Sequence, residues 1–294
     1  MVREINAKSI LVTSKNPSSW FGVKYTMNIY RGCQHGCIYC DSRSECYQIQ
    51  NFDDIDVKIN AVELLKKELV RKRIKGTIGT GAMSDPYIPI EKKYRLTQKS
   101  LQVIADNHYP VHITTKSNII LRDIDILQQI NNIYAQVAIT ITTYDDSLSQ
   151  KIEPRAPVSS DRFKALGILS SLGIHAGITL MPILPFIEDN EENIIKIIEM
   201  SKDYGVKFIY PAFGMTLRDR QKEYYYSKLD ELFPNLKSKY EKRFKNYYSC
   251  SINNYTKLKN VFFENCDKYG ISTKMPSYES KLSSIQLSFL NKKL

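Results

Sequence analysis

Six short apolar runs rich in β-branched residues alternate with amphipathic segments between residues 25 and 213, and this alternation constrains the fold most. Apolar runs bounded by turn residues predict strands, whereas apolar residues at intervals of three and four predict helices. We expect strands at residues 25–30, 77–81, 111–115, 136–142, 175–181 and 207–213. Helices are expected at residues 57–73, 97–107, 123–131, 160–172 and 191–204.

Helix ends are marked by residues that commonly cap them. Asp123 and Ser160 stand where N-caps belong, and Gly173 and Gly205 follow expected helix ends. Strands that alternate with helices form a parallel sheet through right-handed crossovers. We therefore predict an α/β fold, a partial (βα)6 TIM-like barrel that is too open to close as eight strands do, with a C-terminal helical extension. Reactive groups are expected at the carboxyl ends of its strands.

The chain is predicted to divide into an N-terminal extension (residues 1–20), a (βα)6 core (21–215) and a helical C-terminal region (216–294). The last region holds 16 of the 42 Lys and Arg, 8 of the 31 Asp and Glu, and 9 of the 20 Tyr, so it is the basic part of the chain. Basic residues among aromatic ones can bind phosphates and stack on bases. A solvated helical layer with tyrosines in its seam explains the same composition.

The sequence lacks the features of a membrane or secreted protein. No apolar stretch approaches the ~20 residues of a transmembrane helix, and the first 20 residues do not resemble a signal peptide. The spacing of the six cysteines does not indicate a disulfide framework, and unpaired thiols suit a reducing compartment. We expect a cytoplasmic protein without a membrane partner.

Cys33, Cys37 and Cys40 form a glycine-flanked Cys-x3-Cys-x2-Cys run after the first expected strand. Three thiolates on a tight loop can bind three irons of a [4Fe-4S] cluster and leave the fourth iron without a protein ligand. The same cysteines could instead hold a structural zinc ion together with His35 or Cys46. A fourth thiolate from Cys46 would close the cluster and leave an electron carrier.

The second and third strands end in polar residues that suit a charged ligand. Ser84 and Asp85 follow the second strand and could accept hydrogen bonds from an ammonium group, although Ser-Asp-Pro also forms ordinary turns. Lys116 follows the third strand and could pair with a carboxylate, although a lysine there is often only solvated.

The fourth strand and the loop after it add further candidates. Thr140 and Thr142 share one face of the strand, which lines the barrel if it points inward. Arg155 in the following loop could form a fork with a carboxylate, and Glu153 could orient it or bind a ribose hydroxyl.

Together these motifs resemble those of radical S-adenosylmethionine (radical SAM) enzymes, in particular the spore photoproduct lyase-like members, also called DNA repair photolyase-like. The resemblance extends over most of residues 20–270 and includes a stretch like Gly214-Met215-Thr216-Leu217-Arg218-Asp219. Its main motifs are Arg31-Gly32-Cys33-x3-Cys37-x2-Cys40, Ser84-Asp85-Pro86-Tyr87, Thr115-Lys116-Ser117, Glu153-Pro154-Arg155-Ala156-Pro157 and Pro182-Ile183-x-Pro185.

The resemblance implies a [4Fe-4S] cluster on Cys33, Cys37 and Cys40 whose open iron chelates SAM. Reductive cleavage of SAM would yield a 5'-deoxyadenosyl radical that abstracts hydrogen from a substrate, with nucleic acid as the candidate substrate. It implies a reductant such as flavodoxin or ferredoxin. The expected SAM-binding residues are Tyr39, Ser84, Asp85, Lys116, Thr140 and Arg155.

One position departs from the pattern of spore photoproduct lyases. They keep a cysteine two positions before the residue matching Ser84, where it donates hydrogen to the product radical, and this chain has Ala82. Because alanine cannot donate that hydrogen, we predict a relative of the lyase rather than the lyase itself. The alternative is a metal-containing nucleic-acid-binding or electron-transfer protein without SAM chemistry.

Overall fold

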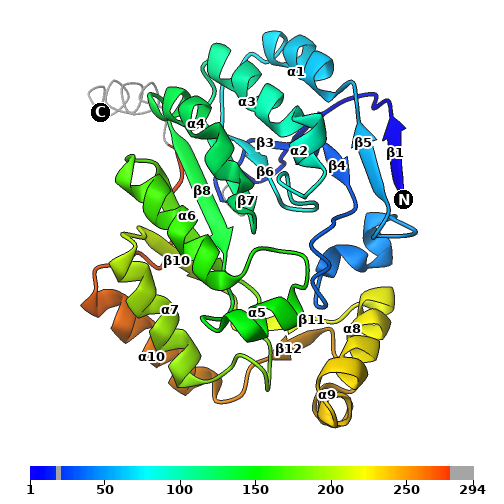
Figure 1. Cartoon of the computed structure of the whole chain (residues 1–294), viewed down its shortest axis with the longest axis vertical. Helices are drawn as coiled ribbons and strands as arrows, with labels where there is room; N and C mark the ends of the chain where they lie inside the picture. Colours follow the sequence, from blue (N-terminus) through cyan, green and yellow to red (C-terminus); the bar gives the residue numbers. More distant parts are fainter. Residues whose placement is uncertain (18–20, 279–294) are drawn as a thin grey trace, which may run out of the picture.

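A computed structural model describes residues 1–17 and 21–278 of the chain, and the main sheet of these residues has the strand order β10-β9-β8-β7-β6-β3-β2 (Figure 1). Six of its strands are parallel: β3 (Tyr25–Met27), β6 (Ile78–Thr80), β7 (Val111–Thr115), β8 (Ala135–Thr140), β9 (His175–Leu180) and β10 (Phe208–Pro211). β2 (Leu11–Thr13) pairs antiparallel with β3 at one edge. This arrangement confirms the predicted partial (βα)6 barrel.

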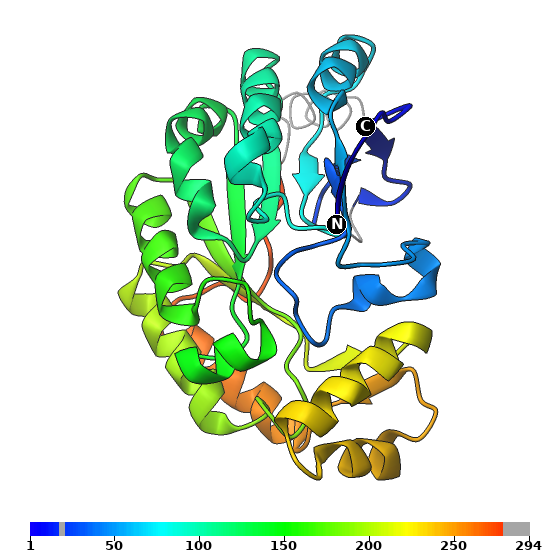
Figure 2. The ribbon, with the colours of Figure 1, turned by 45° about the vertical axis from the view of Figure 1, so that its right-hand side comes forward.

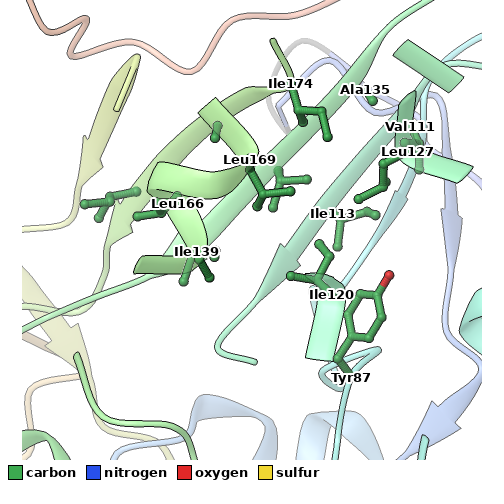
Figure 3. Packing of buried hydrophobic residues seen from close by; sticks show 14 of the residues in the cluster. Tyr87, Val111, Ile113, Ile120, Leu127, Ala135, Ile139, Leu166, Leu169 and Ile174 are labelled. Carbon is green, nitrogen blue, oxygen red and sulfur yellow. The ribbon is translucent and has the colours of Figure 1, made fainter. Parts of the chain in front are cut away.

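Helices link the parallel strands and cover the outer face of the sheet (Figure 1). They are α1 (Ala61–Val70), α3 (Leu96–Asp106), α4 (Ile124–Asn131), α6 (Ser159–Ser171) and α7 (Glu191–Asp203). Figure 3 shows how Leu166 and Leu169 of α6 lie beside Ile139 of β8 in the buried core. Each fully buried side chain of this kind contributes roughly 1.5–3 kcal/mol of transfer free energy.

Short helices occupy the loops near the carboxyl ends of the strands. They are α2 (Glu91–Tyr94), α5 (Asp146–Ile152) and the 3-10 turns η2 (Asp41–Arg43), η3 (Glu45–Tyr47) and η4 (Asn118–Asp123). None of the helices in the described part of the chain is both long and apolar enough to cross a bilayer.

A second sheet contains β1 (Val2–Ile5), β5 (Ile55–Lys58) and β4 (Tyr30–Arg31) in the order β1-β5-β4. The helix expected at residues 57–73 is therefore wrong at its start, because it begins at Ala61. Ile55 and Val57 are buried on one face of β5, which finds its hydrogen-bonding partners in β1 and β4. The segment predicted as an N-terminal extension contains β1 and β2, which pair with strands of the two sheets.

The C-terminal region contains α8 (Asp219–Leu232), α9 (Leu236–Phe244), α10 (Tyr255–Lys268) and a small antiparallel pair of β11 (Gly214–Thr216) with β12 (Ser249–Ser251). Figure 2 shows α8, in yellow, beside the blue segment that contains η2 and η3, and α10 packs on α7. Tyr225, Tyr226 and Tyr240 are buried between α8 and α9. The predicted region continues to residue 294, beyond the described residues.

The two glycines expected after helices do follow helix ends, whereas the two residues expected as N-caps do not cap a helix with their side chains. Gly173 and Gly205 follow α6 and α7 with φ of +72° and +67°. Asp123 precedes α4, but its carboxylate accepts hydrogen bonds from Gln98 and Arg122 instead of capping the helix. Ser160 lies inside α6 and hydrogen-bonds to Asp146.

Candidate active site

The cysteine loop follows β4 and turns on two glycines with positive φ. Gly32 has φ of +85°, and a Cβ there would lie 2.2 Å from the carbonyl oxygen of Asp54, so only glycine fits. The side chains of Cys33 and Cys37 are buried, and Cys40 is half-buried. The glycine turns allow one short loop to carry all three thiols within the eight residues from Cys33 to Cys40.

The three thiols influence one another electrostatically. Burial raises the pKa of Cys33 to about 12, and Asp85 and Cys40 contribute in the same direction. Burial also raises the pKa of Cys40, which Lys116 partly counteracts. Among the described residues, no group of three or more His, Cys, Asp or Glu is placed so that it could hold one metal ion. A cubane whose cysteines bind separate irons fits three neighbouring thiols on one loop.

Asp85 joins the end of β6 to the end of β7 and to the cysteine loop. Its carboxylate accepts hydrogen bonds from the Thr115 hydroxyl at 2.7 Å, the Lys116 amide at 2.7 Å and the Tyr87 amide at 2.8 Å. His35 Nε2 lies 3.2 Å from the same carboxylate. Burial raises the pKa of Asp85, but His35 and the hydrogen bonds outweigh it and lower the pKa to about 2. Both carboxylate oxygens are bound within the protein.

Ser84 is also bound within the protein. Its hydroxyl is buried and donates a hydrogen bond to the carbonyl oxygen of Gly32, next to the first cysteine. The two residues expected to bind the SAM ammonium therefore both fasten β6 to the cysteine loop in this structure.

Glu153 gathers three side chains in the interior beside the cysteines. Its carboxylate lies 2.5 Å from Arg162 Nη2 and 3.8 Å from Lys116 Nζ, and it accepts a hydrogen bond from the Tyr39 hydroxyl. Burial raises the pKa of Glu153, but Arg162 and Lys116 outweigh it and lower the pKa. For Lys116, burial opposes the charge, whereas Cys37 and Glu153 raise its pKa. Lys116 is thus a half-buried cation held beside the cysteines.

Thr140 lies inside the barrel, as expected for a residue on the inner face. Its hydroxyl is 2.8 Å from that of Thr179 on the neighbouring β9. Its carbonyl oxygen accepts a hydrogen bond of 2.9 Å from Arg162 Nη1. Arg162 thus ties the end of β8 to the Glu153 network.

Arg155 lies on the outer side of the cysteine loop. Its amide donates to the His35 carbonyl oxygen at 3.0 Å, and its guanidinium covers Gly36 and lies 3.3 Å from Asp53 Oδ1. The Ile38 amide donates to the carbonyl oxygen of Ile152 at 2.9 Å, so the segment after α5 runs along the loop. Together with His35 and Ser117, Arg155 lines a cavity of about 330 Å³ on this side of the loop.

Two cavities meet where β6 and β9 end. The larger, of about 500 Å³, lies between the cysteine loop and the β11–β12 pair, and its wall includes Tyr39, Cys40, Asp41, Thr216, Arg218 and Ser249. The smaller, of about 110 Å³, lies inside the barrel, and its wall includes Gly81, His112, Thr114, Thr140 and Thr179. Ala82 and Met181 line both cavities. The position that lacks the expected cysteine therefore stands at their junction.

The C-terminal region supplies part of the cavity wall, although none of its residues was among the site residues expected from the sequence. Thr216, Arg218 and Ser249 come from β11, β12 and the start of α8, about 200 residues after the cysteines. The stretch containing Thr216 and Arg218 carried a sequence signal, since it belongs to the family resemblance, but its residue types alone did not indicate a place in the site.

The family model of the radical SAM superfamily matches residues 27–201. The chain therefore belongs to the radical SAM superfamily, whose members use a [4Fe-4S] cluster and SAM. This confirms the resemblance drawn from the motifs.

Relatives of the chain occur in archaea, bacteria and viruses. An uncharacterized protein of Methanocaldococcus jannaschii is 35% identical over 66% of this chain and 73% of its own length. An uncharacterized protein of Mycobacterium tuberculosis is 26% identical over 82% of this chain and 73% of its own. The radical SAM Nalpha-GlyT isomerase of Pseudomonas phage M6 is 24% identical over 54% of this chain and 33% of its own.

Among solved structures, the chain resembles spore photoproduct lyase complexed with dinucleoside spore photoproduct. The TM-score is 0.68 at 13% identity, and the match covers 91% of this chain and 79% of that one. At this identity the likeness concerns the fold, which includes the C-terminal region as well as the barrel.

Proposed function

We propose that this protein is an enzyme that binds a [4Fe-4S] cluster on Cys33, Cys37 and Cys40 and SAM in the adjoining 500 Å³ cavity. The observation that carries the proposal is the position of the cysteine loop, whose third cysteine lines that cavity while Lys116 faces the thiols from inside the protein. When bound, the cluster and SAM supply reductive cleavage of SAM and a 5'-deoxyadenosyl radical that abstracts hydrogen from the substrate.

The residues around the cavity divide into binding and supporting roles. Lys116, held beside the cysteine loop by Glu153, pairs with the SAM carboxylate. Tyr39 forms part of the cavity wall, and Thr140 lines the adjoining space in the barrel. For Ser84, Asp85 and Arg155 the contacts support a different role, because their polar atoms already fasten the cysteine loop to β6 and to the segment after α5. A flavodoxin- or ferredoxin-type protein is the proposed reductant, in the cytoplasm.

We propose a nucleic acid as the substrate. Two observations support this class: the basic C-terminal region and the fold shared with spore photoproduct lyase complexed with dinucleoside spore photoproduct. With Ala82 at the junction of the cavities, the product radical obtains its hydrogen elsewhere or reacts by another route. We therefore infer a reaction different from that of spore photoproduct lyase.

The test is the release of 5'-deoxyadenosine from SAM by anaerobically reconstituted, dithionite-reduced protein, with Cys37→Ala as the control. We expect release from the wild type and none from the variant, because the variant lacks one iron ligand. A brown, cluster-loaded wild type that releases no 5'-deoxyadenosine would instead be an electron carrier. A colourless protein with stoichiometric zinc would exclude the enzyme altogether.

A further inference from the structure

The start of α8 is bound to the segment that follows the cysteines. Asp219 accepts hydrogen bonds from the Glu45 amide at 3.0 Å and from the Ser44 hydroxyl at 3.2 Å. Arg220 donates to the carbonyl oxygens of residues 49 and 50, both at 2.9 Å. Gln221 Nε2 donates to the Tyr39 carbonyl oxygen at 3.2 Å. These three side chains fix the position of α8 against the cysteine loop.

Arg218 directly precedes these residues and lines the 500 Å³ cavity. Its side chain is 30% exposed, and its Nε lies 3.3 Å from Asp41 Oδ1. Its remaining partners are weak, since Nη1 donates to the Cys46 sulfur at 3.2 Å and Nη2 donates to the Tyr248 hydroxyl. A thiol and a phenol are poorer acceptors for a guanidinium than an anionic oxygen, so an anion entering the cavity can replace them.

Asp41 does not depend on Arg218 for its partners. Its carboxylate also accepts hydrogen bonds from the Thr216 hydroxyl and the Tyr47 hydroxyl, each at 3.0 Å. If Arg218 turns toward an anion, Asp41 keeps these two bonds and still holds β11 against the loop. Arg218 can therefore exchange partners without leaving the Asp41 carboxylate unsatisfied.

The surroundings of Arg218 suit a nucleic acid. Its guanidinium stacks on the Tyr248 ring at 4.8 Å, and the rings of Tyr248 and the adjacent Tyr247 are 48% and 69% exposed. Exposed aromatic rings beside an arginine are the elements with which proteins hold a single strand, by stacking on bases and pairing with phosphates.

We propose that Arg218 is a substrate-binding residue. Its guanidinium makes a bidentate contact with a phosphodiester of a single-stranded or extruded nucleic acid segment and thereby places the adjoining nucleotide in the cavity. The assignment rests on the proposed function in one respect, that this cavity is the reaction site. It adds the group of the substrate that is recognised and the residue that recognises it.

The test uses a fluorescent dinucleotide whose linkage is either a phosphodiester or an uncharged methylphosphonate, with the full-length, cluster-loaded protein. We expect the wild type to bind the charged linkage about tenfold more tightly, corresponding to about 1.4 kcal/mol. Arg218→Gln is expected to bind both probes equally. Lys257→Gln, which removes the charge of an exposed side chain on α10, serves as the matched control and should discriminate between the two probes as the wild type does.

Equal discrimination by wild type and Arg218→Gln would overturn the assignment, as would a wild type that binds neither probe. Should Arg218→Gln fail to retain its cluster, Arg218→Lys provides the second test. Lysine keeps the charge but cannot make the bidentate contact, so this variant should discriminate less than the wild type between the charged and the uncharged linkage. Undiminished discrimination would contradict the proposal. Because these are binding measurements, they can fail while 5'-deoxyadenosine release succeeds, and the reverse holds as well.

Discussion

At the residue scale, Glu153 is the charge on which the interior of the site depends. Its replacement by Gln leaves the buried Arg162 and the half-buried Lys116 without their counter-charge. Removing one partner of such a buried pair costs about 3 kcal/mol or more. We predict a loss of this size in the free energy of unfolding of the cluster-free protein, measured in urea.

The same variant should raise the KM for SAM more than it lowers kcat, because Lys116 loses the carboxylate that holds its ammonium group beside the cysteines. The control is Glu63→Gln, which breaks the exposed pair with Lys67 on α1 and should leave both stability and KM unchanged. A Glu153→Gln protein as stable as the wild type, with an unaltered KM, would contradict a positioning role.

His112 makes a prediction about pH. Burial lowers its pKa from 6.5 to about 4, against an opposing hydrogen bond with Gln136. The unfolded chain therefore takes up a proton that the folded chain resists, and the stability present above pH 6.5 is lost as the pH falls toward 4. We expect this single group to lower the free energy of unfolding by about 3 kcal/mol over that range.

The comparison is between the wild type and His112→Gln, with urea unfolding measured across the range. The free energy of unfolding of the variant should decline less steeply as the pH falls, because the variant lacks His112. The decline that remains comes from the acid groups that both proteins share. His108→Gln, at an exposed histidine, should keep the wild-type slope. Parallel slopes for wild type and His112→Gln would exclude His112 as the source.

At the element scale, the close approach of the chain after β6 to the neighbouring β7 depends on a glycine. Gly81 has φ of +100°, and a Cβ there would lie 1.8 Å from the carbonyl oxygen of Thr114. We predict that Gly81→Ala destabilises the protein by roughly 3 kcal/mol, because backbone strain and steric overlap add. Gly173→Ala has a similar positive φ but open space, so it should cost only about 1 kcal/mol. Equal unfolding midpoints in urea for the two variants would contradict this account.

The elements that the sequence predicts well are those with local signals. The strand expected at residues 111–115 is β7 (Val111–Thr115), because four of its five residues are β-branched and this signal is local. The helix expected to begin at residue 57 begins at Ala61 instead, because the preceding residues form β5 by pairing with β1, more than 50 residues away in sequence. A pairing at that distance leaves no trace in the local pattern.

At the scale of the whole molecule, the site is assembled from distant parts, and this limits what the sequence can indicate. The cysteine run and the lysine at a strand end are visible because spacing and strand ends are local features. The partners of Asp85 and Ser84 are not, since they depend on which loops the fold brings together. The contribution of Arg218 depends on the packing of α8 against the cysteine loop.

The central claim is that three cysteines hold a cluster whose remaining iron is open to SAM. The most direct measurement is the electron paramagnetic resonance spectrum of the reduced, cluster-loaded protein before and after addition of SAM, for the wild type and Cys46→Ala. We predict that SAM changes the spectrum of both proteins in the same way. A wild-type spectrum indifferent to SAM, together with a Cys46→Ala spectrum that responds, would show that Cys46 closes the cluster and would contradict the account.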